Sequence, residues 1–164
     1  MIAAIIADPI GALISEARRY LAEREQPVGS NRSTRIDYWL VETGAPLGAP
    51  WCAAFVAGVG RQALGAAWPV PRTASVQQIV DWADPRQVCF AEPERGDLLV
   101  IHFPELHRFA HVGIVTDAKA DTLATIEANT NPNGEREGYG VFTRQRPASP
   151  RYRFVRWAHA VGAL

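Results

Sequence analysis

The sequence has few of the features that mark disulfide-stabilised, membrane-spanning or nucleic-acid-binding proteins. Its 164 residues include two cysteines, Cys52 and Cys89, which are too few for a disulfide framework. No run approaches the roughly 18 apolar residues that a membrane span needs. Seventeen basic and seventeen acidic residues cancel, so no net charge would attract nucleic acid. We therefore expect neither a membrane span nor a nucleic-acid partner.

The N-terminal stretch also lacks the pattern of a secretory signal. Residues 1–7 are apolar, but no basic segment precedes them and Asp8-Pro9 follows at once. We therefore expect the protein to be made in the cytoplasm without a signal peptide. An action outside the cytoplasm would then require assisted delivery.

What the sequence does contain is sufficient for one folded domain. A composition of 48% hydrophobic and 21% charged residues is ordinary for a globular chain of this length. Apolar residues at helical spacing predict helices at residues 9–21, 34–43, 52–64 and 73–83. Short β-branched and aromatic runs predict strands at residues 97–103, 111–116, 122–128, 140–144 and 152–157.

The order of these elements indicates the fold class. Helices in the first half and closely connected strands in the second are typical of an α+β fold. We expect N-terminal helices packed on an antiparallel β-sheet of about five strands. Because no internal repeat or long linker divides the chain, we expect a single domain at residues 1–164.

Cys52 opens the predicted helix at residues 52–64. A thiol at a helix N-terminus lies beside the positive end of the helix dipole, which favours the nucleophilic thiolate. A free cysteine is equally often a small buried hydrophobe, so position alone leaves both interpretations open. Cys89 lies in an apolar run without a helix start, which favours an inert thiol. Gly58 and Gly60 in the helix predict a close approach of the helix to a sheet.

Three polar residues of the predicted strands could serve such a thiol. His111 opens a strand, where an imidazole at the border of a cleft could take and return the thiol proton, although a lone histidine is more often structural. Glu127 and Asn129 alternate along the next strand, so we expect both on one face. Taken alone, the segment at Asn129 is typical of an ordinary turn.

Together these residues follow the order of papain-like hydrolases, and the sequence resembles the CHAP family of cysteine- and histidine-dependent amidohydrolases and peptidases. The matching motifs are GAPWCAAFV at 48–56, RGDLLV at 95–100, HVGIV at 111–115, TIEANTN at 125–131 and GVF at 140–142. The resemblance implies a papain-like fold in which Cys52 is the nucleophile and His111 the base. It also implies Glu127 and Asn129 as the residues that orient and polarise His111. Ala128 departs from the glycine of many relatives without removing a functional group.

The two partners are expected to divide their work. Residues two apart on a strand are separated by about 6.6 Å, so Glu127 and Asn129 cannot make the same contact with one ring nitrogen. A carboxylate makes the stronger bond to an imidazolium, and we therefore expect Glu127 to orient His111 and Asn129 to support it. The reverse assignment stays open.

The resemblance also implies a reaction and a setting. It implies hydrolysis of amide bonds in peptidoglycan, as an N-acetylmuramoyl-L-alanine amidase or an endopeptidase, without a metal or organic cofactor. The setting would be that of a phage lysin or a secreted antibacterial effector, with delivery machinery or an immunity protein as partner. Trp51, Glu25 and Asn31 are expected to line the substrate cleft. Two alternatives stay open: a cysteine protease or isopeptidase acting on protein, and a wall-binding module without turnover.

A zinc site is the competing chemical interpretation. His102, His107 and His111 lie within ten residues, but their spacing matches no helical zinc motif. Pro104 also interrupts any helix that would align them. We expect no metal, with His102 on a strand and His107 in a hairpin loop.

Overall fold

The structure, a computed structural model, describes residues 7–160. Residues 1–6, which carry most of the stretch examined for a signal peptide, lie outside the described residues. The helices are α1 (Pro9–Arg18), α2 (Thr34–Glu42), α3 (Cys52–Leu64) and α4 (Val76–Ala83). The strands are β1 (Cys89–Phe90), β2 (Leu98–Phe103), β3 (Arg108–Ala118), β4 (Thr122–Thr130), β5 (Gly140–Pro147) and β6 (Tyr152–Val155). Short 3-10 turns occur at η1 (Gly65–Ala67), η2 (Asp84–Arg86), η3 (Pro104–Leu106) and η4 (Trp157–Ala160).

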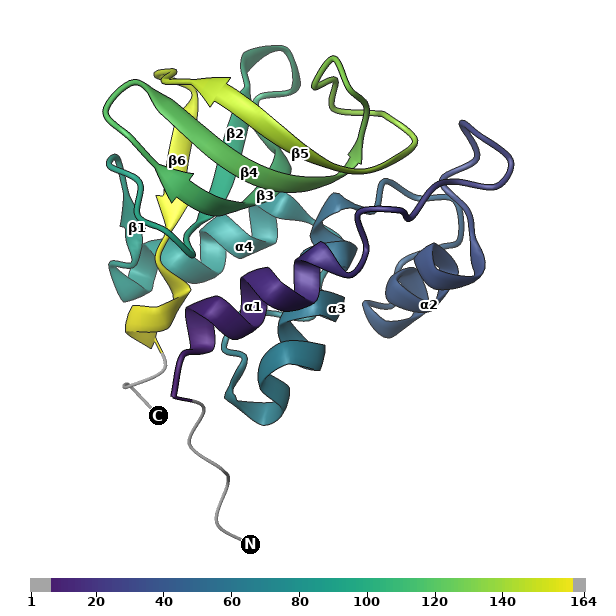
Figure 1. The fold of residues 1–164 in the computed structure, drawn as a ribbon, viewed down its shortest axis with the longest axis horizontal. Helices are drawn as coiled ribbons and strands as arrows, with labels where there is room; N and C mark the ends of the chain where they lie inside the picture. Colours follow the sequence, from purple (N-terminus) through teal and green to yellow (C-terminus); the bar gives the residue numbers. More distant parts are fainter. Residues whose placement is uncertain (1–6, 161–164) are drawn as a thin grey trace, which may run out of the picture.

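Helices and sheet form two layers, with the helices gathered on one side of the sheet (Figure 1). The six strands follow the order β1-β6-β2-β3-β4-β5, and every neighbouring pair is antiparallel. The predicted α+β class is therefore confirmed. The sheet has six strands instead of about five, because the two-residue strand β1 pairs with the end of β6. No helix within residues 7–160 is both long and apolar enough to cross a membrane.

The helix boundaries follow from short-range signals. Asp8 accepts a hydrogen bond from the N–H of Gly11 at 2.7 Å and precedes a proline at the first helical position of α1. Helix α1 ends at Arg18, earlier than the predicted residue 21. Ser75 accepts from the N–H of Gln78 at the start of α4, which therefore begins three residues later than predicted.

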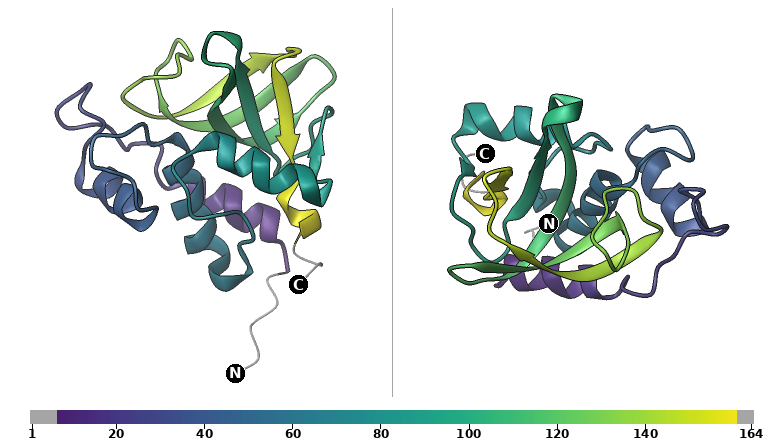
Figure 2. Two further views of the ribbon diagram at one scale, coloured as in Figure 1. Left: turned by 180° about the vertical axis from the view of Figure 1, so that it is seen from behind. Right: turned by 90° about the horizontal axis from the view of Figure 1, so that it is seen from above.

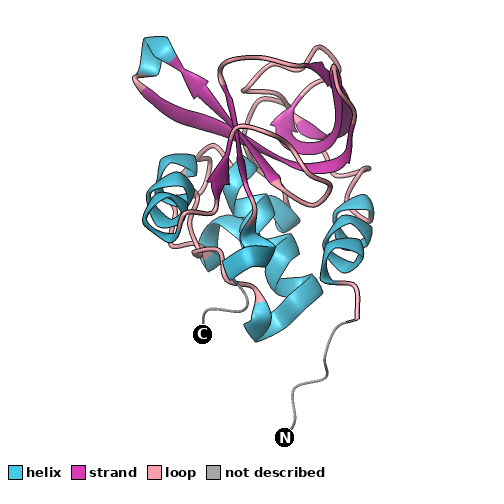
Figure 3. Cartoon of the chain, turned by 90° about the vertical axis from the view of Figure 1, so that its left-hand side faces the viewer, coloured by secondary structure: helices cyan, strands magenta, loops and turns pink. Residues whose placement is uncertain are grey.

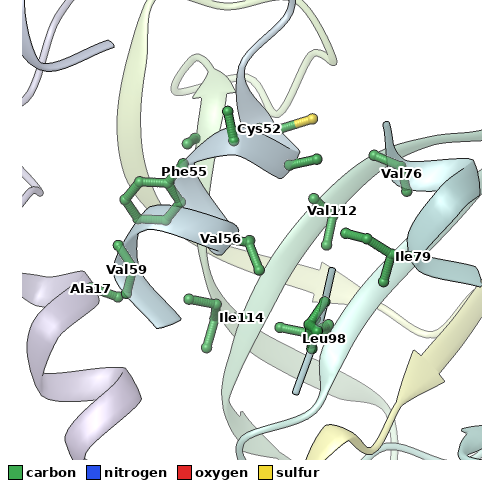
Figure 4. Close-up of a cluster of buried hydrophobic side chains, with 14 of the residues drawn as sticks. Ala17, Cys52, Phe55, Val56, Val59, Val76, Ile79, Leu98, Val112 and Ile114 are labelled. Atoms are coloured by element: carbon green, nitrogen blue, oxygen red, sulfur yellow. The ribbon is translucent and has the colours of Figure 1, made fainter. Parts of the chain in front are cut away.

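Helix α3 lies at the centre of the helical layer. It packs against α1 and α2 and against β3 and β4, and Figure 3 shows the sheet lying above the helices. The contact with the sheet is apolar: Val56 of α3 belongs to the same buried cluster as Val112 and Ile114 of β3 (Figure 4). This packing places the start of α3 beside the central strands.

The two faces of the sheet carry different clusters, as strand alternation predicts. Leu98 and Val100 of β2 point into the main core under the helices, whereas Leu99 and Ile101 belong to a second, smaller cluster. That second cluster also contains Val115, Leu123 and Phe154. Because the sheet is bent (Figure 2), its face away from the helices also buries side chains.

The glycines of α3 do not serve the approach of the helix to the sheet, and that prediction is wrong. A Cβ at Gly58 would lie 2.2 Å from Cδ1 of Trp39, and a Cβ at Gly60 would lie 2.1 Å from Cε2 of Trp68. Both indoles are buried. The glycines therefore make room for two tryptophans from other parts of the helical half.

Candidate active site

Cys52 is the first residue of α3, and Trp51 is the N-cap of that helix. No side chain within the described residues caps this helix start, which leaves N–H groups of the first turn available. The exposed fraction of Cys52 is 4%. Figure 4 shows its sulfur at the margin of the core cluster. Little of Cys52 is therefore exposed to solvent.

His111 lies in β3, the strand against which α3 packs, and is 1% exposed. Its Nε2 atom lies 2.8 Å from Oε2 of Glu127. Because a carboxylate only accepts hydrogen bonds, Nε2 is assigned the proton of this pair. Nδ1 is buried and has no hydrogen bond of ordinary geometry within the described residues. The Cys52 side chain nevertheless lies close enough to interact with the ring, so Nδ1 is the nitrogen left for the thiol.

Glu127 is fully buried and receives hydrogen bonds at both carboxylate oxygens. The hydroxyl of Thr125 donates to Oε1 at 2.6 Å. The guanidinium of Arg146 donates from Nε to Oε1 at 2.6 Å and from Nη2 to Oε2 at 2.7 Å. Gly113, opposite Glu127 in β3, leaves space for the carboxylate stem, because a Cβ there would lie 2.5 Å from Cγ of Glu127. The carboxylate that holds His111 is therefore itself held by Thr125 and Arg146.

These contacts set the charges of the site. Burial by itself would lower the pKa of His111, but the Cys52 side chain and Glu127 outweigh it and raise this pKa to about 9. Burial would raise the pKa of Glu127, yet Arg146 and His111 hold it well below its usual range. Burial would likewise lower the pKa of Arg146, and Glu127 raises it above its usual value. At neutral pH the site therefore contains an imidazolium, a carboxylate and a guanidinium in a row.

Asn129 has other hydrogen-bond partners than Glu127, which binds His111. Its φ is +56°, and the pairing of β4 with β5 shifts register between Glu127 and Thr130. The irregularity turns the side chain away from regular alternation. Its Oδ1 accepts from the backbone N–H of Trp51 at 3.1 Å, and its Nδ2 donates to Gly138 O at 2.9 Å. Asn129 thus joins the start of α3 to the loop after β4.

The three residues expected to line the substrate cleft support the helix start. Trp51 is fully buried, stacks on Trp39 with ring centroids 6.1 Å apart, and donates from Nε1 to Oε1 of Glu25 at 3.0 Å. Glu25 is 2% exposed, so both side chains of this pair are buried. Asn31 is half-buried, accepts from Asn129 Nδ2 at 3.0 Å and donates to Gly48 O at 3.1 Å. Direct contact of Trp51, Glu25 or Asn31 with a substrate stays a prediction.

The remaining histidines lie elsewhere. His102 lies in β2 with its ring edge-on to Phe109, and His107 occupies the exposed turn before β3. Within residues 7–160, no group of three or more His, Cys, Asp or Glu side chains is arranged to hold a metal ion.

The other cysteine, Cys89, is half-buried in β1 and free. Burial raises the pKa of its thiol, and the nearby carboxylate of Asp84 raises it further. These surroundings disfavour the thiolate that a nucleophile requires.

Two residues of the site, Arg146 and Thr125, were not expected from the sequence. Their signal is the alternation of side chains: Thr125 stands two residues before Glu127 on β4, and Arg146 occupies a half-buried position of β5 between exposed neighbours. Such alternation identifies the face of the strand on which a side chain lies, but not the residue of a neighbouring strand that it contacts.

Comparisons with known proteins leave the site to be interpreted from its own geometry. The chain matches no family model and no curated protein sequence. The crystal structure of Ly7917 is similar over 89% of this chain and 61% of that chain, with 17% sequence identity and a TM-score of 0.49. This chain thus spans less than two thirds of that protein, and the likeness is too weak to bear on fold or function.

Proposed function

We propose that the chain is a cysteine-dependent peptidoglycan hydrolase of the CHAP type, which cleaves an amide bond through a thioester intermediate. The observation that carries this proposal is the arrangement of His111, which is held by Glu127 on one ring nitrogen and lies beside Cys52 at the N-terminus of α3. A thiol, an imidazole and an orienting carboxylate in this order are the components of nucleophilic acyl transfer.

In the proposed first step, the Cys52 thiolate attacks the carbonyl carbon of the substrate amide. The thiol proton resides on Nδ1 of His111, and Glu127 stabilises the resulting imidazolium through Nε2. The tetrahedral intermediate collapses when Nδ1 gives its proton to the leaving amine. The acyl group then remains on the Cys52 sulfur as a thioester.

The start of α3 provides the donors for the oxyanion. The N–H of Trp51 is already bound to Asn129, so the free donors begin at Cys52 and continue through the first turn. These groups lie at the positive end of the helix dipole, where a negative oxygen is stabilised. In the second step, Nδ1 of His111 takes a proton from water, the hydroxide attacks the thioester, and the acid and the Cys52 thiol are released.

The substrate class rests on the resemblance of the five sequence motifs to CHAP enzymes. It supports an amide bond of peptidoglycan, either between sugar and peptide or within the peptides. A role as phage lysin or antibacterial effector, with delivery machinery or an immunity protein as partner, follows from the same resemblance. No step of the proposed reaction requires a metal or an organic cofactor.

Digestion of purified sacculi tests the proposal. The protein should release soluble fragments whose masses show a new amine and a new carboxyl group, and mass spectrometry of these fragments identifies the bond. The Cys52→Ala variant should release none, and the Cys89→Ala variant serves as the matched control. If the sacculi stay intact while a casein or isopeptide substrate is cleaved, the proposal of wall hydrolysis is contradicted and a protease or isopeptidase activity is supported.

The compartment of action provides a second test. If peptidoglycan is the substrate, expression in the cytoplasm should be harmless, whereas fusion to a periplasmic signal should lyse the host. Lysis should disappear with Cys52→Ala. Equal toxicity from both compartments would indicate an intracellular substrate and contradict the proposal.

A further inference from the structure

The geometry points to Arg146 as a positioning residue of the catalytic centre, which holds the carboxylate of Glu127 in the place and charge state in which Glu127 orients His111. This inference rests on the proposed function in one respect: His111 is taken to serve Cys52. Arg146 belongs to β5, and the CHAP-like motifs of the sequence do not include it.

The first argument is the geometry of the fork. Nε and Nη2 of Arg146 each bind a different oxygen of Glu127, at 2.6 and 2.7 Å. The same two oxygens serve Thr125 and His111 respectively. A rotation of the carboxylate that improved one of these contacts would break another. The planar fork therefore fixes the orientation of Glu127 in a way that a single ammonium could not.

The second argument is charge in a buried place. Glu127 is fully buried, and a carboxylate without a paired cation is strongly disfavoured there. The side chain of Arg146 is 14% exposed, so it carries its charge at the edge of the interior, where it retains contact with solvent. Its Nη2 also donates to the carbonyl of Gly134 at 3.4 Å, which ties it to the loop between β4 and β5.

The groups facing the carboxylate are few within the described residues. Arg146 approaches Glu127 from β5 and His111 approaches it from β3. Behind them, Tyr152 of β6 lies against Arg146, and Cys52 of α3 lies against His111. Without Arg146, the imidazolium would be the one cation left for Glu127.

The consequence is a dependence on pH. Arg146 lowers the pKa of Glu127, so the carboxylate stays ionised as the pH falls. Removing the guanidinium must raise this pKa, and burial then favours the neutral acid. A neutral Glu127 no longer stabilises the imidazolium of His111. The acidic limit of Cys52 reactivity should therefore move to higher pH when Arg146 is lost.

The experiment follows the rate of Cys52 alkylation by iodoacetamide between about pH 4 and pH 10, in the folded full chain. In Arg146→Met the acidic limb should move upward by about one to three pH units, the range typical for loss of an adjacent opposite charge. Arg146→Lys keeps the charge but not the fork and should show a smaller shift. Arg144→Met is the matched control, because Arg144 lies two residues away on β5 and binds the carbonyl of Pro132 instead.

A double variant shows whether Arg146 acts through Glu127. In a Glu127→Gln background there is no carboxylate to hold, so Arg146→Met should add no further shift of the limb. This comparison also serves if Arg146→Met alone fails to fold, because the double variant leaves no buried charge unpaired at this pair. Circular dichroism and thermal melting establish folding in each case.

Three outcomes would overturn the inference. One is a rate reduced equally at all pH values in Arg146→Met, as expected for a merely structural residue. Another is the same shift in Arg144→Met, and the third is an equal additional shift in the double variant. Alkylation of Cys52 does not require wall hydrolysis, so the two proposals can fail separately. If the protein releases no fragments from sacculi but the acidic limb still shifts in Arg146→Met, peptidoglycan is refuted as the substrate and the positioning role of Arg146 is retained.

Discussion

Nε2 of His111 and Oε2 of Glu127 lie 2.8 Å apart, and both side chains are almost completely shielded from solvent. A pair buried in this way cannot exchange its contacts for water, so its protonation is determined by the protein groups around it. On the histidine side that group is Cys52, and on the glutamate side it is Arg146. The charge of His111 beside Cys52 is therefore determined by a chain of contacts that runs through β3, β4 and β5.

Replacement of Glu127 by Gln should move the alkaline limb of the proposed hydrolysis rate to lower pH. Protonation of the leaving amine needs the imidazolium of His111, which is lost as the pH rises through its pKa of about 9. Glutamine keeps the shape of the side chain but removes the charge that helps to raise this pKa. The limb should fall by about one unit or more.

The pH dependence of fragment release from sacculi measures this shift. Glu105→Gln, an exposed carboxylate in the turn before β3, is the control and should leave both limbs in place. An alkaline limb unchanged in Glu127→Gln would show that the carboxylate does not stabilise the imidazolium.

Iodoacetamide should modify Cys52 before Cys89, although accessibility favours the opposite order. Cys52 is 4% exposed and Cys89 is half-buried. We expect the surroundings to decide the order, because His111 lies beside Cys52, while burial and Asp84 raise the pKa of Cys89. Peptide mapping by mass spectrometry at short reaction times gives the order. Faster labelling of Cys89 at neutral pH would argue against an activated Cys52.

The helical half could be predicted well because its boundaries are encoded within a few residues. Helix α3 spans Cys52–Leu64 as expected, since Pro50 precedes the helix and Gly65 follows it with a φ of +58°. The side chain of Ser33 similarly accepts the N–H of Ile36 at the start of α2. Signals of this kind do not depend on the rest of the chain.

Arg146 could not be predicted because its contact depends on how distant strands pair. Strand register places Leu123 opposite Arg146, and Phe142 opposite Glu127. The long guanidinium side chain reaches along the sheet to Glu127, whereas Arg144 on the same strand binds the loop instead. Alternation alone does not distinguish these two arginines.

The contact between Asn129 and Trp51 also could not be predicted from the sequence. The sequence indicates that both belong near the nucleophile, and the structure brings them together through the backbone N–H of Trp51. Their roles depend on an irregular strand and on a buried indole, and neither follows from local spacing.

Gly58→Ala should destabilise the protein although alanine is the better helix former. The new Cβ would lie 2.2 Å from Cδ1 of the buried Trp39, which cannot move without disturbing the core. Overpacking of this kind costs about 1–3 kcal/mol, against about 1 kcal/mol gained in helix propensity. Urea denaturation measures the net loss. Arg61 is exposed on the same helix, so Arg61→Ala is the control and should change the free energy of unfolding by less than about 0.5 kcal/mol. A Gly58→Ala variant more stable than the unchanged protein would refute the packing argument.

Asn129→Ala should lower both stability and rate while leaving the pH limbs in place. It leaves the buried N–H of Trp51 without its acceptor, which costs about 1–3 kcal/mol. It also places alanine at a φ of +56°, a strain that Asn129→Gly avoids, so the glycine variant should recover part of the stability but not the rate. Because the amide binds the helix start and not the ring of His111, the imidazolium keeps its pKa. Urea denaturation and alkylation profiles test both statements. A limb that moves in Asn129→Ala and stays fixed in Glu127→Gln would exchange the roles of the two residues.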